Sequence, residues 1–122
     1  MTTFGEHTVM ATHICWYEKL NSNAKGGAAA FARLFAIPGE THCGGGIALE
    51  KFDALGALMA WVESGNAPDQ ITASVNKANK EIPASWSPDR TRPLCPWPAY
   101  AKYVSGDAEA ASSFTCAAPD PE

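Results

Sequence analysis

The stretch FAIPGETHCGGG, residues 35–46, decides how the chain is organised. It begins with a short apolar run and a Pro-Gly turn, which ends regular structure because proline lacks a backbone donor and glycine tolerates turn conformations. His42 and Cys43 follow side by side, directly before three glycines. The pattern predicts a short buried strand over residues 33–37 and a glycine-rich loop over 38–49 that carries two reactive side chains.

Helical patterns lie on both sides of this strand and loop. Apolar residues recur at steps of three and four over residues 8–22 and again over 50–63. The second segment carries Glu50 and Asp53 where the first turn of a helix favours acidic side chains. Two amphipathic helices are therefore expected. A further short strand is predicted over residues 70–75.

The last third of the chain is rich in proline. Residues 83–100, PASWSPDRTRPLCPWPAY, contain five of the nine prolines, a density that neither a helix nor a central strand tolerates. Residues 77–122 are therefore predicted to form an irregular tail that needs an anchor. A disulfide between Cys95 and Cys116, which bracket the second half of this tail, would provide the anchor. Two unrelated buried thiols are the alternative.

The predicted element order is helix, strand, histidine loop, helix, strand and proline-rich tail. A length of 122 residues fits one modest domain. One or two strands do not form a stable sheet in water, because a sheet needs more strands or a packed face to be stable. The sequence therefore predicts a piece of an α/β domain.

Composition and charge exclude several classes of protein. Hydrophobic residues make up 46% of the chain, charged residues 18%, and the formal net charge is −4. Lys and Arg are scattered, which argues against a nucleic acid or an anionic membrane surface as partner, and no apolar run is long enough to span a membrane. The N-terminus, MTTFGEHTVMATH, lacks the basic and apolar regions of a secretory signal. Either the protein stays in the cytosol or its front end is missing.

A zinc site is the metal interpretation that the sequence allows. It would combine His13, Cys15, His42 and Cys43. Structural zinc ligands come in pairs whose spacing lets both side chains converge on one ion, whereas His13 and Cys15 lie two apart on a predicted helix and point in different directions. No metal is therefore predicted, and Cys15 is expected to be a buried thiol on a helix face.

Five blocks of the sequence follow one another in the order of a known family: WYEKL (16–20), RLFAIPGETHCGGG (33–46), FDALGALMAWVESGNAPD (52–69), RTRPLCPWPAYAKY (90–103) and GDAEAASSFTC (106–116). With these blocks the chain resembles the C-terminal part of the tannase and feruloyl esterase family of α/β-hydrolases. The resemblance covers residues 1–122 almost completely and implies a C-terminal fragment of an α/β-hydrolase catalytic domain.

The resemblance also implies roles for single residues. His42 corresponds to the histidine of the catalytic triad, the general base. Cys43 corresponds to a cysteine that forms a disulfide with the cysteine directly before the nucleophilic serine. Cys95 and Cys116 correspond to the family's C-terminal disulfide. The substrates implied are small esters of aromatic or phenolic acids, including a terephthalate monoester in one branch. No cofactor is expected, and family members are mostly secreted or periplasmic.

The chain also departs from the family pattern. The nucleophile motif, Gly-x-Cys-Ser-x-Gly-Gly, does not occur in these 122 residues. The triad aspartate belongs just ahead of the first helix, where Glu6 is the acid available as an orienting group. We therefore expect an inactive segment that supplies His42 and leaves Cys43 as an unpaired thiol, with a complementing chain carrying the Cys-Ser motif as a possible partner. The alternative is a non-catalytic truncated module or a subunit that docks on a partner chain.

Overall fold

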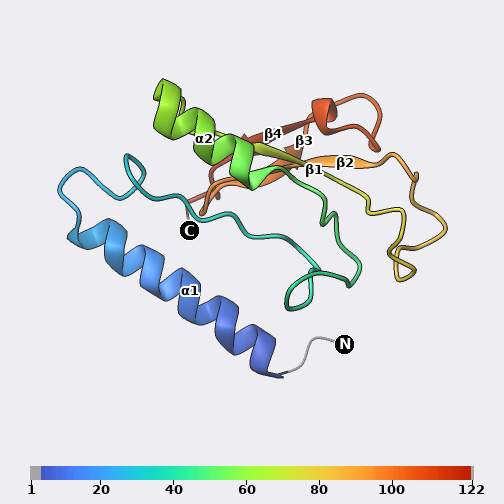
Figure 1. Cartoon of the computed structure of the whole chain (residues 1–122), viewed down its shortest axis with the longest axis horizontal. Helices are drawn as coiled ribbons and strands as arrows, with labels where there is room; N and C mark the ends of the chain where they lie inside the picture. The colour runs from blue at the N-terminus through green and yellow to red at the C-terminus, as the bar shows by residue number, and fades with distance from the viewer. Residues whose placement is uncertain (1–3, 122) are drawn as a thin grey trace. The chain divides into compact units, whose positions relative to one another are not determined.

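The computed structural model describes the backbone of residues 4–121 and the side chains of residues 10–121 (Figure 1). The chain divides into two compact units, Met1–Leu34 and Phe35–Glu122. The elements in chain order are α1 (Phe4–Asn23), α2 (Ala54–Ser64), β1 (Ile71–Ser74), β2 (Thr91–Leu94), β3 (Tyr100–Tyr103), the 3-10 helix η1 (Ala111–Ser113) and β4 (Phe114–Ala117).

The first unit is built on the long helix α1, which confirms the helix predicted over 8–22 and extends it at its N-terminal end. Tyr17 is buried and its hydroxyl donates to the carbonyl of Ala32, 3.0 Å away. Cys15 is exposed, so the expectation of a buried thiol is wrong. The reason is the helical period: a residue two positions from the buried Tyr17 points to a different side of the helix.

The strand predicted over residues 33–37 is not formed. Phe35 makes a single antiparallel bridge with Pro96, and the rest of the segment is irregular. Proline at the bridge partner has no backbone N–H to extend a ladder, and the Pro-Gly turn ends the segment directly afterwards. The segment nevertheless packs in the core, because Phe35 and Ile37 contact the buried cluster of the second unit.

Helix α2 has a cap at each end. The Asp53 carboxylate accepts a hydrogen bond from the Gly56 N–H at 2.8 Å, and Gly65 adopts the left-handed conformation with φ 72°. The helix predicted over 50–63 therefore begins later than expected. The expectation that Glu50 lies in its first turn is wrong, because the side chain of Asp53 takes the N-cap position.

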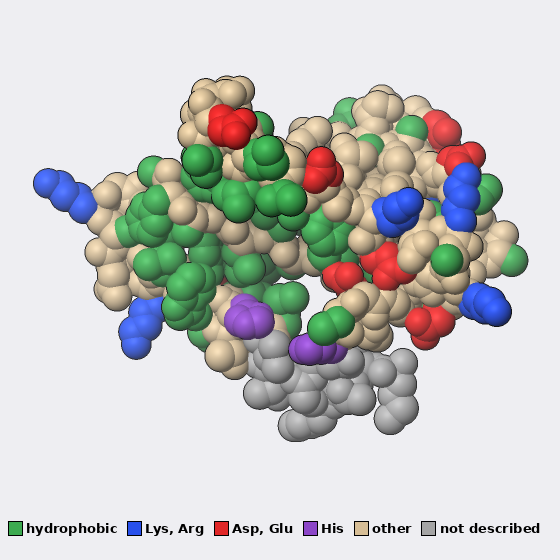
Figure 2. All heavy atoms as spheres, viewed as in Figure 1, with side chains coloured by type: hydrophobic (Ala, Val, Ile, Leu, Met, Phe, Trp, Pro, Cys, Tyr) green, Lys and Arg blue, Asp and Glu red, His purple; other side chains and the backbone are tan. Residues whose placement is uncertain are grey.

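No residue of α2 is buried within the described part of the chain. Leu55 is 68% exposed and Val62 76%, and hydrophobic side chains gather over this helix in the space-filling view (Figure 2). An apolar helix normally buries one stripe against a neighbouring element. Among the described residues, no element therefore buries the apolar stripe of α2.

The proline-rich tail contains regular structure that the sequence did not predict. β1, which confirms the strand predicted over 70–75, pairs antiparallel with β2, and β3 pairs antiparallel with β4. The expectation of an irregular tail over 77–122 is thus wrong. Each strand is short and belongs to a two-stranded sheet, so Pro93 is accommodated in β2 as prolines are in edge strands.

A disulfide joins the two strand pairs, as predicted. Cys95, directly after β2, is bonded to Cys116 in β4 across a sequence separation of 21. The buried core beside it consists of Leu49, Ala73, Val75 and Leu94. No helix among the described residues is long and apolar enough to cross a membrane.

The close approach of Gly39 and Gly46 at the base of the histidine loop gives a stability prediction. Gly46 has φ 79°, and a Cβ atom there would lie 2.3 Å from the Gly39 carbonyl oxygen. Gly65 has a similar φ of 72° but no atom within 4 Å of its added Cβ. We expect Gly65→Ala to lower the free energy of unfolding by about 1 kcal/mol through φ strain alone. Gly46→Ala should cost about 3 kcal/mol, since the backbone must also shift.

Urea unfolding of the two variants and the parent chain measures this difference. The Gly65→Ala variant is the matched control, because it carries the same conformational strain without the steric clash. Equal losses of stability in the two variants would contradict the close packing at Gly46.

Candidate functional site

His42 and Cys43 are the central residues of a tight turn. The Gly44 N–H donates to the Thr41 carbonyl at 3.2 Å, and the Thr41 hydroxyl donates to the Gly44 carbonyl at 2.6 Å. Cys43 has φ 65°, a left-handed conformation that non-glycine residues adopt uncommonly. We call residues 41–44 the histidine turn. It presents both reactive side chains to solvent.

The imidazole of His42 contacts the neighbouring thiol. Its Nδ1 lies 3.0 Å from Sγ of Cys43. In a serine triad Nδ1 is held by a carboxylate while Nε2 takes the serine proton. In this chain the thiol occupies the Nδ1 side, and no hydrogen bond joins a carboxylate to His42 within the described residues. Of the two ring nitrogens, Nδ1 is thus the one that has a hydrogen-bond partner among the described residues.

Three polar side chains bind the glycines that follow the histidine turn, and a fourth, that of Asn76, supports Glu50. Glu50 accepts a hydrogen bond from the Gly45 N–H, and Glu81 accepts one from the Gly46 N–H at 2.7 Å. Two asparagines complete the arrangement, and we call the set Glu50, Asn76, Asn79 and Glu81 the loop clamp. The bonds from the Gly45 N–H and from Asn76 hold the pKa of Glu50 below its ordinary value.

The pKa of a neighbouring acid, Glu40, shifts in the opposite direction. Burial raises the pKa of Glu40, and the negative charge of Glu50 raises it further. Glu40 also bridges to Gly46, on the far side of the histidine turn. The base of the turn is therefore bordered by Glu50, whose charged form is stabilised, and by Glu40, whose charged form is destabilised.

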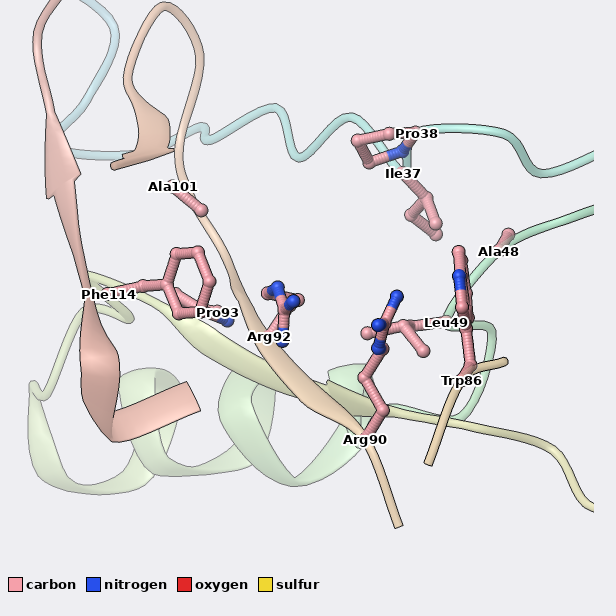
Figure 3. A pocket seen from close by; sticks show the side chains of 10 residues that line it. All are labelled: Ile37, Pro38, Ala48, Leu49, Trp86, Arg90, Arg92, Pro93, Ala101 and Phe114. Atoms are coloured by element: carbon pink, nitrogen blue, oxygen red, sulfur yellow. The ribbon is translucent and has the colours of Figure 1, made fainter. Parts of the chain in front are cut away.

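A cavity of about 300 Å³ lies in the second unit (Figure 3). Its walls are mainly apolar, but Arg90 and Arg92 also line it. The Arg90 guanidinium lies 4.1 Å from the ring centre of Trp86, and that of Arg92 lies 4.1 Å from the ring centre of Phe114. Neither His42 nor Cys43 belongs to the lining, so the cavity is separate from the histidine turn.

Arg90 is fixed by an ion pair that gives a pH prediction. It forms two hydrogen bonds with the Glu109 carboxylate, one of 2.6 Å from Nε, and lowers the pKa of that carboxyl to about 2 from the ordinary 4.5. A lowered carboxyl pKa stabilises the fold at neutral pH, and this contribution disappears as the pH falls from about 4.5 to about 2. Glu109→Gln should therefore lower the Tm at neutral pH, with the difference shrinking towards pH 2.

Thermal unfolding over this pH range measures the effect. Asp89→Asn is the control, because Asp89 pairs with Lys77 while their side chains are 77% and 69% exposed, and such pairs contribute little. A Tm difference for Glu109→Gln that stays constant down to pH 2 would contradict the ion-pair explanation.

The remaining predicted site residues belong to the other unit of the chain or lie outside the description. No group of three or more His, Cys, Asp or Glu side chains in the described part of the chain is placed to hold a metal ion. His13 and Cys15 belong to the first unit, and the histidine turn to the second. Glu6 lies on α1, but its side chain is outside the described residues, so its role as the orienting acid remains a prediction.

Comparison with known proteins places this chain in a family. The family model for tannase and feruloyl esterase matches residues 8–117. The chain is 50% identical over 105 residues to a mono(2-hydroxyethyl) terephthalate hydrolase from Piscinibacter sakaiensis, covering 85% of this chain and 17% of that protein. It is 38% identical over 89 residues to a probable feruloyl esterase from Arthroderma benhamiae, covering 71% of this chain and 16% of that protein.

Two solved structures from Aspergillus oryzae share the fold. An esterase superposes with a TM-score of 0.64 at 24% identity, covering 86% of this chain and 24% of that one. Feruloyl esterase B superposes with a TM-score of 0.55 at 24% identity, covering 91% of this chain and 23% of that one. The chain thus spans about 17% of the length of the terephthalate hydrolase and less than a quarter of these structures. On the match over residues 8–117, the chain belongs to the tannase and feruloyl esterase family.

Proposed function

We propose that this chain is the C-terminal segment of a serine carboxylic ester hydrolase and supplies its triad histidine, His42. The observation that carries the proposal is the histidine turn: a hydrogen-bonded turn presents His42 and Cys43 to solvent in a chain that belongs to an esterase family. A general base must reach a nucleophile held on another part of the fold, and an exposed side chain at the tip of a fixed turn meets that need.

The chemistry follows the two ring nitrogens of His42. Nε2 accepts the proton of the nucleophilic serine as the serine attacks the ester carbonyl, and later donates this proton to the leaving alcohol. Nδ1 must then donate to a carboxylate that stabilises the imidazolium. Glu6 is our candidate for this acid within the 122 residues.

Cys43 fits this scheme as the partner of the cysteine before the serine. In the present structure its thiol lies 3.0 Å from Nδ1 of His42, where the orienting carboxylate would bind. A disulfide from Cys43 to the nucleophile elbow draws the sulfur away from the ring and frees Nδ1. The same bond keeps the histidine turn beside the serine.

The substrate that we propose is a small ester of an aromatic acid. One relative, 50% identical, is a mono(2-hydroxyethyl) terephthalate hydrolase, and another is a probable feruloyl esterase. We further propose a secreted or periplasmic location for the full-length enzyme, because disulfides such as Cys95–Cys116 persist in oxidising compartments.

A second candidate function is a non-catalytic module that docks on a partner chain. It is favoured by helix α2, whose Leu55 and Val62 side chains are 68% and 76% exposed. Both candidates need a larger partner surface. They differ in whether His42 then takes part in ester hydrolysis.

A chimeric hydrolase tests the proposal. Residues 8–117 replace the matching segment of the Piscinibacter sakaiensis relative, and hydrolysis of mono(2-hydroxyethyl) terephthalate is measured. We expect turnover by the chimera, none by the 122-residue chain alone, and none by a chimera whose nucleophilic serine is replaced by alanine. A chimera that is folded by circular dichroism yet inactive would contradict the catalytic proposal. The docking module would then be the remaining candidate function. Turnover by the 122-residue chain alone, inhibited by phenylmethylsulfonyl fluoride, would contradict it as well.

A further inference from the structure

We propose that Glu50 and Glu81 are positioning residues for His42: together they clamp the backbone of the glycines that follow the histidine turn and so fix the direction of the imidazole. This inference rests on the proposed role of His42 as general base. Both acids bind the loop through its backbone N–H groups, so their effect on chemistry passes through the loop backbone.

The clamp binds two successive backbone donors with two separate carboxylates. Gly45 donates to Oε2 of Glu50, and Gly46 donates to Oε2 of Glu81 at 2.7 Å. Carboxylate oxygens also contact the loop closely: a Cβ added at Gly44 would lie 3.1 Å from Oε2 of Glu50, and one at Gly45 would lie 3.3 Å from Oε2 of Glu81. The loop therefore fits between two acids that come from different parts of the chain.

Glu50 is itself held on both sides. Its Oε1 accepts a hydrogen bond from the Asn76 amide at 2.8 Å. The next residue, Lys51, bridges to Ser74 of β1 through two backbone hydrogen bonds of 2.8 and 3.1 Å. The backbone on which Glu50 stands is thus tied to the sheet that lies beside the buried core.

Glu81 is anchored through Asn79. The Asn79 amide donates to the Gly46 carbonyl at 2.9 Å, and its Oδ1 accepts the Glu81 N–H at 2.9 Å. Both polar groups of the Gly46 backbone are therefore bound by one short segment. A shift of this segment would move the histidine turn with it.

The carboxylates of Glu50 and Glu81 bind the loop more strongly than neutral side chains of the same shape would. A hydrogen bond from a backbone N–H to a carboxylate is stronger than one to a neutral amide oxygen. The lowered pKa of Glu50 keeps it charged at neutral pH, and among the described residues two further acids, Glu40 and Glu81, lie at the loop. A glutamine at either position keeps the shape of the side chain but weakens the bond to the loop.

Nuclear magnetic resonance of the 122-residue chain tests the clamp without any assay of activity. On acidification, the Gly45 amide proton should move upfield with a midpoint below 4.5, the ordinary carboxyl value, as Glu50 takes up a proton. Glu50→Gln should abolish this titration and broaden the His42 ring signals. Glu63→Gln on the exposed side of α2 is the matched control and should do neither. Persistence of the Gly45 titration in Glu50→Gln would overturn the clamp.

Kinetics of the chimera test the positioning role. Glu50→Gln and Glu81→Gln should each lower kcat roughly 10- to 100-fold with little change in KM, because a misplaced general base reacts poorly with substrate that is still bound normally. Glu63→Gln should leave kcat unchanged. A folded Glu50→Gln chimera with full kcat would overturn the inference. An inactive parent chimera would instead refute the proposed function, and the amide titration would still report on the clamp.

Discussion

Replacement of His42 by alanine in the chimeric hydrolase is expected to lower kcat by at least about a thousandfold, with KM nearly unchanged. Without the imidazole no group takes the serine proton or returns it to the leaving alcohol, and the remaining turnover comes from the oxyanion hole and substrate binding. Hydrolysis of mono(2-hydroxyethyl) terephthalate, followed at saturating substrate, measures the change.

His13→Ala is the matched control for this prediction. His13 is exposed on α1 in the first unit, and the same change of residue type there should leave kcat within about twofold. Similar losses of kcat in the two variants would mean that His42 has no special role. A His42→Ala chimera that retains full activity would refute the general-base assignment outright.

Removal of the Cys95–Cys116 disulfide is expected to produce a large loss of stability. Replacing both cysteines by alanine releases a closed loop with a separation of 21 residues, which should lower the free energy of unfolding by about 3 kcal/mol in the chain-entropy account. The bond also ties β4 to the end of β2, so the pairing of β3 with β4 should be weakened first. Urea unfolding under non-reducing conditions measures the loss.

Cys43→Ala provides the control, since Cys43 is an exposed free thiol in the second unit. Its replacement should change the free energy of unfolding by no more than about 0.5 kcal/mol. A double variant that is as stable as the parent chain would show that the disulfide is not needed to hold the C-terminal strands.

The parts of the fold that the sequence predicts correctly are those set by local rules. Helix α2 ends where Gly65 takes the left-handed conformation, and β1 is a short β-branched and apolar run. The disulfide follows from two cysteines that bracket a segment in need of an anchor. Each of these depends on residues that are close in sequence or on a simple constraint.

The parts that were missed depend on partners far along the chain. The apolar run at 33–37 has the composition of a strand, but pairing requires a neighbour with free donors, and its neighbour is Pro96. Strand β2 contains Pro93, which local rules exclude from a central strand but which a two-stranded sheet accommodates. Proline density alone therefore overestimated the irregularity of the tail.

In the candidate site, too, the features set by neighbouring residues can be predicted and those that depend on distant residues cannot. The histidine turn is recognisable because His42 and Cys43 are adjacent and followed by glycines. The loop clamp is not recognisable, because Gly46 and Glu81 are separated by 35 residues and the apolar period predicts a helix at Glu50. The asparagines and the acid in NKANKE, residues 76–81, are a local signal typical of a polar turn able to bind a backbone.

We propose that His42 and Cys43 both face a nucleophile elbow carried by another part of the full-length enzyme. Non-reducing peptide mapping of the chimera by mass spectrometry tests this arrangement. We predict a disulfide-linked peptide pair that joins Cys43 to the cysteine directly before the nucleophilic serine. Complete labelling of Cys43 by iodoacetamide in the folded, active chimera would contradict this arrangement.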